Sequence, residues 1–298
     1  VSFFVFNIHV LNYTGSSFLS SFEKLTELHL FMIQNGDITP LKTLKHLETL
    51  ELYGIECTDY ATLSELPALK KLNLSRSNLS DLSLISGLRD LEALDISYTS
   101  IHDLSDIGSF PHLTWLSFGK YYALDEDITY SGLEALQSLH YLETLEINGF
   151  RSFDPAFLAG ISSLKCVNFQ DTDFINEEAL SNLTNLETLV IWDSDFSDPS
   201  CLTSLSDLHY LSLYGCAISD YSSLAEMTNL GILTIYDDSI AVYSGEPVYQ
   251  LSEEQSALLV ASLKNTYLQL NEIEYHESIS WSSDDRLDDP FTGAGNFY

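Results

Sequence analysis

The chain has 298 residues, and its 12 lysines and arginines against 44 aspartates and glutamates give a formal net charge of −32. This balance argues against a nucleic-acid partner or an anionic membrane surface, because both attract Lys and Arg. A hydrophobic fraction of 45% supports a continuous core and excludes wholesale disorder. Four cysteines without a CxxC spacing exclude a zinc ribbon and a disulfide scaffold, and no apolar run approaches the roughly 18 residues that span a bilayer.

The chain opens on the apolar segment VSFFVFNIHVL, residues 1–11. No Lys or Arg precedes it, and the first basic residue is Lys24, so the segment lacks the charged start of a signal peptide. We therefore interpret it as part of the fold. Because the chain begins without Met, we expect a leader or upstream region outside this sequence.

From this segment onwards a short apolar motif, LxxLxL, recurs along the chain. LETLEL, LKKLNL and LEALDI are three consecutive copies. The last apolar position of each copy falls at 8, 30, 52, 74, 96, 118, 147, 169, 191, 213 and 235. Successive positions in this series differ by 22, except that 118 and 147 differ by 29, which identifies a repeat array of eleven units.

The interior of each unit is equally regular, with apolar residues 11, 14, 17, 20 and 22 positions after that last apolar residue. The final LxL alternates with period two, which predicts a short strand, and the preceding LxxLxxL has period three, which predicts a 3-10 or short helical turn. Between them, five repeats place an Asp that we expect to cap the following turn: Asp59, Asp81, Asp103, Asp198 and Asp220.

With stretches such as IHDLSDI (101–107) and ISDYSSL (218–224), the repeat resembles the leucine-rich repeat family, specifically its bacterial, internalin-like class, which shares this period of 22. The resemblance covers residues 1–240. It implies an α/β curved solenoid, with a parallel sheet on the concave face and 3-10 or short helical turns on the convex face. One departure is that the Asn frequent in this family three residues past the strand is mostly replaced, by Ile55, Ser77, Thr99, Thr172 and Cys216.

The longer step between 118 and 147 marks a seven-residue insertion within 119–132. In solenoids, insertions map to loops on one face, which is frequently the binding face. The inserted stretch fits a contact loop, and a tolerated bulge is the equal alternative; its polar and aromatic residues are Tyr121, Tyr122, Asp125, Glu126 and Asp127.

Aromatic residues recur at the outward positions of the predicted strands. Trp192, Tyr214 and Tyr236 each follow a strand's last apolar residue in successive repeats, so we expect a contiguous strip, joined by Tyr210. Tyr53 occupies the same column as the strip, and Trp115 the same column as Tyr210. Such a surface could anchor a protein partner or stack on sugar rings; alternatively the rings pack on one another or under the C-terminal tail.

An acidic cluster accompanies the strip. QDTDF (170–174) and WDSDF (192–196) are in register, which places Asp171 beside Asp193 and Asp173 beside Asp195. Four close carboxylates repel one another unless something neutralises them. Calcium is one candidate, a basic patch on a partner is another, and a solvated acidic edge is the third.

After residue 240 the repeat pattern ends. SEEQSALLVASLKN begins with a Ser cap and two Glu, which predicts a helix over 252–264, and TYLQLNEIEY (266–275) alternates like an edge strand. We expect residues 241–275 to form a cap over the last repeat. The tail, 276–298, is acidic and aromatic, and is either mobile or laid against the body.

No catalytic constellation is present in the sequence: HExxH, GxSxG, GxxxxGK[ST] and GxGxxG are all missing. Cys57 and Cys216 fall at inward turn positions, which predicts buried structural thiols, and Cys166 should point out of the concave sheet. An enzyme would need a site assembled from distant repeats.

The sequence therefore predicts a non-catalytic protein-binding module that engages a protein partner on its concave face, with glycan or cell-wall binding as the alternative. By the resemblance, we expect a bacterial cell-surface or secreted protein. A cytoplasmic setting stays open, since free thiols fit it too.

Overall fold

The computed structural model describes residues 21–31, 36–120, 129–236 and 267–270. The chain divides into two compact units, of which unit 1 comprises the described residues up to 142 and unit 2 those from 143 onwards. Four predicted features lie outside the described residues: the first repeat ending at Ile8, the inserted residues 121–128, the helix over 252–264 and the tail at 276–298.

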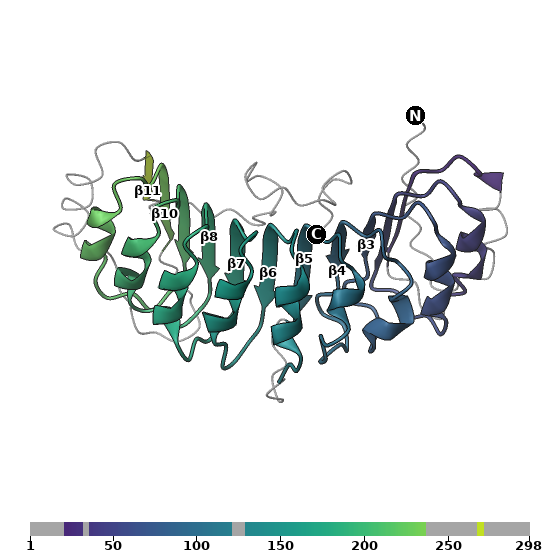
Figure 1. Ribbon diagram of the computed structural model, residues 1–298, viewed down its shortest axis with the longest axis horizontal. Helices are drawn as coiled ribbons and strands as arrows, with labels where there is room; N and C mark the ends of the chain where they lie inside the picture. Colours follow the sequence, from purple (N-terminus) through teal and green to yellow (C-terminus); the bar gives the residue numbers. More distant parts are fainter. Residues whose placement is uncertain (1–20, 32–35, 121–128, 237–266, 271–298) are drawn as a thin grey trace, which may run out of the picture. The chain divides into compact units, whose positions relative to one another are not determined.

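Unit 1 consists of five parallel strands that pair in sequence order, with a 3-10 turn between successive strands (Figure 1). The strands are β1 (Glu27–Phe31), β2 (Thr49–Tyr53), β3 (Lys71–Asn73), β4 (Ala93–Asp95) and β5 (Trp115–Gly119). The turns are η2 (Thr39–Thr43), η3 (Tyr60–Glu65), η4 (Leu82–Ile85), η5 (Ile107–Ser109) and η6 (Leu133–Ser138).

Unit 2 repeats the same arrangement with six parallel strands, again paired in sequence order. The strands are β6 (Thr144–Asn148), β7 (Cys166–Gln170), β8 (Thr188–Trp192), β9 (Tyr210–Tyr214), β10 (Ile232–Tyr236) and β11 (Tyr267–Leu270). The turns are η7 (Pro155–Gly160), η8 (Glu177–Asn182), η9 (Pro199–Ser204) and η10 (Ser222–Glu226). Strand β11 lies within the segment predicted as a strand, and it pairs with β10.

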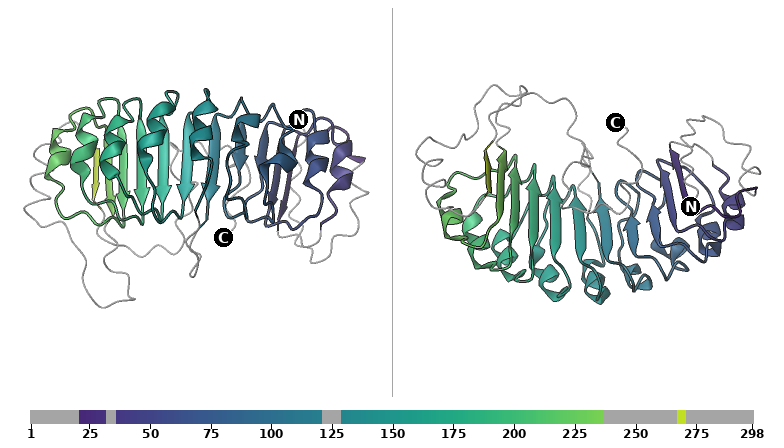
Figure 2. Two further views of the ribbon diagram at one scale, coloured as in Figure 1. Left: turned by 60° about the horizontal axis from the view of Figure 1, so that its bottom comes forward. Right: turned by 90° about the horizontal axis from the view of Figure 1, so that it is seen from above.

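The apolar spacing explains this arrangement. In the repeat that starts at Leu52, the predicted positions Leu63, Leu66, Leu69, Leu72 and Leu74 are all at most 2% exposed. The strand leucines and the turn leucines fill one core from opposite sides, so within each unit the strands form a row on one side and the turns lie on the other (Figure 2, right). The predicted fold, that of the curved leucine-rich repeat solenoids, is confirmed.

The predicted aspartate caps are present at two of the five positions. Asp81 and Asp198 begin η4 and η9 and accept the backbone N–H of the serine two residues on, at 2.8 and 2.9 Å. Asp103 and Asp220 make the same bond at 3.0 and 2.8 Å, but the N-cap residues of η5 and η10 are Asp106 and Tyr221, so these two aspartates are not the caps. In all four carboxyls, the hydrogen bonds from that serine lower the pKa. Asp59 differs, since it accepts from the Thr62 hydroxyl instead.

Where the Asn that is usual in leucine-rich repeats is missing, side-chain hydroxyl groups form hydrogen bonds with the backbone of the turn. The Thr99 hydroxyl donates to the carbonyl of Ile96 at 2.7 Å, and the Thr172 backbone N–H donates to the Ser194 hydroxyl at 3.1 Å. Thr99 and Thr172 are at most 3% exposed. Short hydroxyls therefore satisfy backbone groups of the buried turn that the longer Asn side chain would otherwise reach.

Seven of the described strands are followed by a left-handed residue. The second residue after the strand's last apolar position has a φ between 47° and 69° in seven repeats, at Gly54, Arg76, Tyr98, Gly149, Asp171, Asp193 and Gly215. In the six repeats of this set that precede the one with Gly215, the backbone N–H of the left-handed residue donates to a carbonyl of the next repeat, at 2.7–3.0 Å. The left-handed conformation thus extends the ladder between repeats past the end of the strand.

Replacing Gly215 with alanine should destabilise unit 2 by about 1–2 kcal/mol, because its φ of 57° disfavours any Cβ. A Cβ would also lie 2.3 Å from Asp193 Oδ1, so that carboxylate must move. The measurement is urea unfolding. Gly160→Ala, at the end of η7 and outside the positive-φ set, is the control, and equal losses in the two variants would contradict the conformational explanation.

Candidate partner-binding surface

The aromatic strip is formed in unit 2 by neighbouring strands. Pairing of β8, β9 and β10 places Trp192, Tyr214 and Tyr236 side by side in register. The rings of Trp192 and Tyr214 lie 4.9 Å apart between centroids at an interplanar angle of 69°, and both residues are half-buried. The described part of the strip therefore offers two aromatic side chains set edge to face.

Two predicted contact residues are largely covered. Tyr210 is 8% exposed and Trp115 is 6% exposed. Trp115 is in register with Ala93 on β4, and these two form a small buried cluster of their own. The strand register places both residues in the expected rows, but their side chains are buried, so little of either is left for a partner.

Cys166 is also buried, at 8% exposed, although it occupies an outward position, in register with Thr144 and Thr188. The prediction of an outward-pointing thiol therefore needs this correction: its row is right, but neighbours cover it. Cys57 is buried and Cys216 half-buried, and burial raises the pKa of both thiols, as structural cysteines require.

Tyr53 lies in unit 1, where it belongs to a different surface. Its ring is 6.1 Å from that of Phe31 on the neighbouring strand, and the Arg76 guanidinium lies 5.6 Å from its centroid. The same guanidinium lies 4.7 Å from the Tyr98 ring. Sequence reasoning placed Tyr53 with the strip and did not single out Arg76, because the residues meet only through the left-handed turns.

The acidic cluster sits in the turns after β7 and β8. Asp193 is exposed, whereas Asp171 is 2% exposed. Arg151, from the turn of the preceding repeat, lies 3.9 Å from Asp171 Oδ1 and 3.1 Å from Asp173 Oδ2. An arginine one repeat away thus supplies part of the neutralising charge that the carboxylates were expected to need.

Asp195 is held in another way. It accepts the backbone N–H of Phe174 at 2.7 Å, but burial and the charges of Asp173 and Glu177 outweigh this bond and raise the pKa of the carboxyl. Among the residues that the structure describes, no group of three or more His, Cys, Asp or Glu side chains is placed to hold a metal ion.

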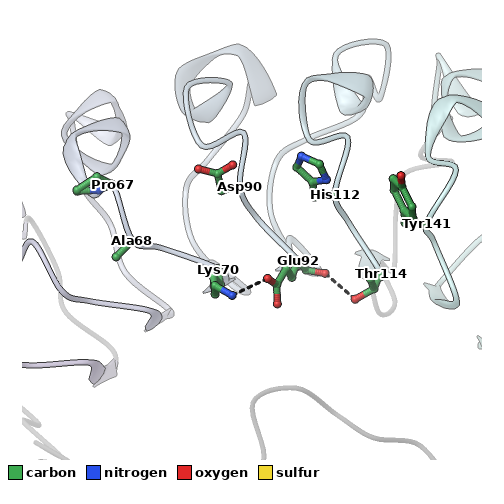
Figure 3. A pocket seen from close by; sticks show the side chains of 8 residues that line it. All are labelled: Pro67, Ala68, Lys70, Asp90, Glu92, His112, Thr114 and Tyr141. Carbon is green, nitrogen blue, oxygen red and sulfur yellow. Dashed lines mark hydrogen bonds and ion pairs between the residues drawn. The ribbon is translucent and has the colours of Figure 1, made fainter.

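An open groove of about 490 Å³ lies in unit 1, where turns lead into strands (Figure 3). Lys70 forms an ion pair with Glu92 at 2.8 Å, and the Thr114 hydroxyl donates to the Glu92 carbonyl at 3.0 Å. The His112 and Tyr141 rings lie 6.1 Å apart beside them. Lys70, Glu92 and Thr114 belong to successive repeats and bind one another across the groove. We therefore interpret these residues as links between repeats rather than as a ligand site.

A buried histidine on the sheet of unit 1 was not singled out from the sequence. His29 is 0% exposed, and its Nε2 lies 2.8 Å from Glu27 Oε1 and its Nδ1 2.7 Å from Glu51 Oε2. Burial lowers the pKa of His29, but the hydrogen bonds and charges of Glu51 and Glu27 outweigh it, so the pKa is raised. The available signal was that Glu51 occupies, one repeat later, the same position in the motif as His29.

No protein-family model and no curated protein matches the chain. Several solved structures do. InlF, an internalin from Listeria monocytogenes, is 21% identical with a TM-score of 0.58, covering 84% of this chain and 74% of that one. The Arabidopsis receptor kinase HAESA, in complex with the peptide hormone IDA and the co-receptor SERK1, is 23% identical with a TM-score of 0.51, covering 71% of this chain and 38% of that one.

TLR13, in a complex with ssRNA13, is 21% identical with a TM-score of 0.51, covering 78% of this chain and 31% of that one. At identities of 21–23%, these structural similarities support the fold alone. No helix within the described ranges has the length and apolar character needed to cross a membrane.

Proposed function

We propose that this chain, a leucine-rich repeat protein with internalins among its structural neighbours, is a non-catalytic module that binds a protein partner through the outward sheet face of unit 2. The observation that carries the proposal is the pair Trp192 and Tyr214, two half-buried aromatics in contact on neighbouring strands. Tyr236 continues the row on β10. Amphipathic aromatics on an exposed sheet are the side chains that anchor interfaces.

The exposed carboxylate of Asp193 directly follows Trp192 and adds a negative rim to this surface. A basic patch on the partner would complement it, since polar rims around an aromatic centre supply orientation and association rate. The net charge of −32 points the same way, because it attracts a cationic protein over a long range.

Replacing both Trp192 and Tyr214 with alanine should weaken partner binding at least about 30-fold, the size of effect expected for a central aromatic anchor. The partner is first captured from host-cell and bacterial-envelope extracts, and its affinity is then measured by calorimetry. Tyr141→Ala, which removes a 60% exposed aromatic from unit 1, is the control. Unchanged affinity in the double variant would contradict the proposal.

Glycan or cell-wall binding by the same aromatics is the second candidate. The edge-to-face angle of 69° gives no flat platform for two sugar rings, which favours a protein side chain between them. Competition by soluble sugars separates the two: they should leave the captured protein bound, and release of the partner by sugar would favour the glycan candidate.

We also propose a bacterial cell-surface or secreted setting, supported by the fold that this chain shares with the internalin InlF. Fractionation of the source cells with an antibody against the chain tests it. The Cys57 and Cys166 thiols are buried, which would shield them in either compartment, so the cysteines do not decide between a surface and a cytoplasmic location.

A further inference from the structure

Arg76 occupies an unusual environment in unit 1. Its guanidinium lies over the Tyr53 ring at 5.6 Å and over the Tyr98 ring at 4.7 Å, measured to the ring centroids. Arg76 itself is exposed, and the two tyrosines are half-buried. Cation–π attraction to the two rings holds the guanidinium in place, and the N–H donors of an exposed guanidinium can still bind a ligand at its edge.

The positive charge of Arg76 has no carboxylate against it within the described ranges, where no Asp or Glu oxygen lies within 4.0 Å of its guanidinium nitrogens. Other cations of the chain do find one, as Lys70 does in Glu92 and Lys165 in Glu143. A chain with 44 acidic residues and 12 basic ones offers carboxylates in excess. The stacking on tyrosines, in place of an acid, therefore leaves this cation available to a carboxylate from outside.

The backbone supports the same conclusion. Arg76 and Tyr98 both have a φ of 58°, at the turn position where other repeats have Gly54, Gly149 and Gly215. Glycine adopts this conformation without strain, and bulky residues do so at a cost in stability. Residues that carry a local strain which other repeats avoid are candidates for a role in binding.

We propose that Tyr53, Arg76 and Tyr98 form a carboxylate-binding site for a Glu or Asp side chain of a protein partner. The planar edge of a guanidinium matches a carboxylate with two parallel hydrogen bonds. A carboxylate is favoured over a phosphate because the net charge of −32 repels a dianion more strongly. The site lies in unit 1 and has the opposite charge to the rim of the unit 2 surface, so it goes beyond the function proposed above.

NMR of protein labelled with nitrogen-15 arginine tests the proposal, because the chain has only four arginines, Arg76, Arg89, Arg151 and Arg286. The probes are acetyl-Leu-Glu-Leu-amide, its Gln counterpart and inorganic phosphate. The Glu peptide should shift the Arg76 Nε–H signal saturably, with at least about tenfold higher affinity than the Gln peptide. The exposed Arg89 is the internal control, and its signal should not move.

Three outcomes would overturn the proposal: equal shifts from the Glu and Gln peptides, equal movement of Arg89, or tighter binding of phosphate than of the Glu peptide. Two variants complete the test, with calorimetry as the readout. Arg76→Gly should fold, since glycine occupies this turn position in other repeats, and should lose Glu-peptide binding. The Trp192→Ala, Tyr214→Ala double variant should retain that binding, which separates this site from the surface in unit 2.

Discussion

Replacing Phe153 with alanine should lower the free energy of unfolding of unit 2 by about 3–5 kcal/mol, the largest loss that we expect from one apolar substitution. The Phe153 side chain is 1% exposed and lies at the centre of an aromatic cluster. Its ring is 5.3 Å from Phe150, 5.6 Å from Phe157, 5.5 Å from Phe169 and 6.4 Å from Phe174, between centroids. Truncation would leave a cavity that the surrounding rings can close only in part.

Urea unfolding followed by circular dichroism measures this loss. Ile175→Ser is the control in the same unit, because Ile175 is 65% exposed and its replacement should change stability by less than about 0.5 kcal/mol. Phe153→Leu should recover part of the loss by filling part of the cavity. A loss below about 1 kcal/mol for Phe153→Ala would show that the cluster relaxes around the missing ring.

Replacing His29 with alanine should cost unit 1 about 3–5 kcal/mol, the range observed when one partner of a buried ion pair is removed. His29 is 0% exposed, and the side chain of Glu51 is 7% exposed, so the variant leaves a nearly buried carboxylate without its cation. Water cannot take over this role without opening the sheet. Urea unfolding measures the loss, and a tolerated substitution would contradict the role of the imidazole as counterion.

The contribution of His29 should also depend on pH. Its pKa is raised above the ordinary value of 6.5 in the folded protein, so the folded state binds the proton more tightly than the unfolded state does. The stabilisation is fully present below pH 6.5 and is lost as the pH rises through the higher, folded value. The gap in melting temperature between the wild type and His29→Gln should therefore narrow as the pH rises from 6.5 through the higher pKa of the folded state. A gap that is constant or widens would mean that the imidazole is neutral.

The fold could be predicted from the sequence because the information lies along the chain. Leu72 and Leu74 face the core because the strand alternates with period two, and each further repeat restates the same geometry. The spacing also placed Trp192 beside Tyr214. What a spacing cannot show is which side chain covers another across neighbouring strands, and for that reason the burial of Trp115 and Tyr210 was missed.

The candidate site depends on contacts of this second kind. Arg151 reaches Asp173 because a long side chain spans one repeat, and Arg76 reaches two tyrosines because its turn is left-handed. Neither rotamers nor turn handedness can be inferred from LxxLxL spacing. The hydroxyl row at Thr99 and Thr172 is an intermediate case, since the residues were noticed as departures from the family but their bonding was not predicted.

The left-handed residue that follows seven of the described strands has a consequence for how such a protein can change. Its backbone N–H holds neighbouring repeats together whichever side chain it carries, as Gly54, Arg76 and Asp193 illustrate. The hydrogen bond between repeats is thus kept at this position while the side chain varies, although residues other than glycine carry a cost in stability. A charged residue, an aromatic residue or a glycine can replace another at this position one repeat at a time. The array can therefore acquire a new binding specificity by single substitutions that keep the backbone hydrogen bonds between repeats.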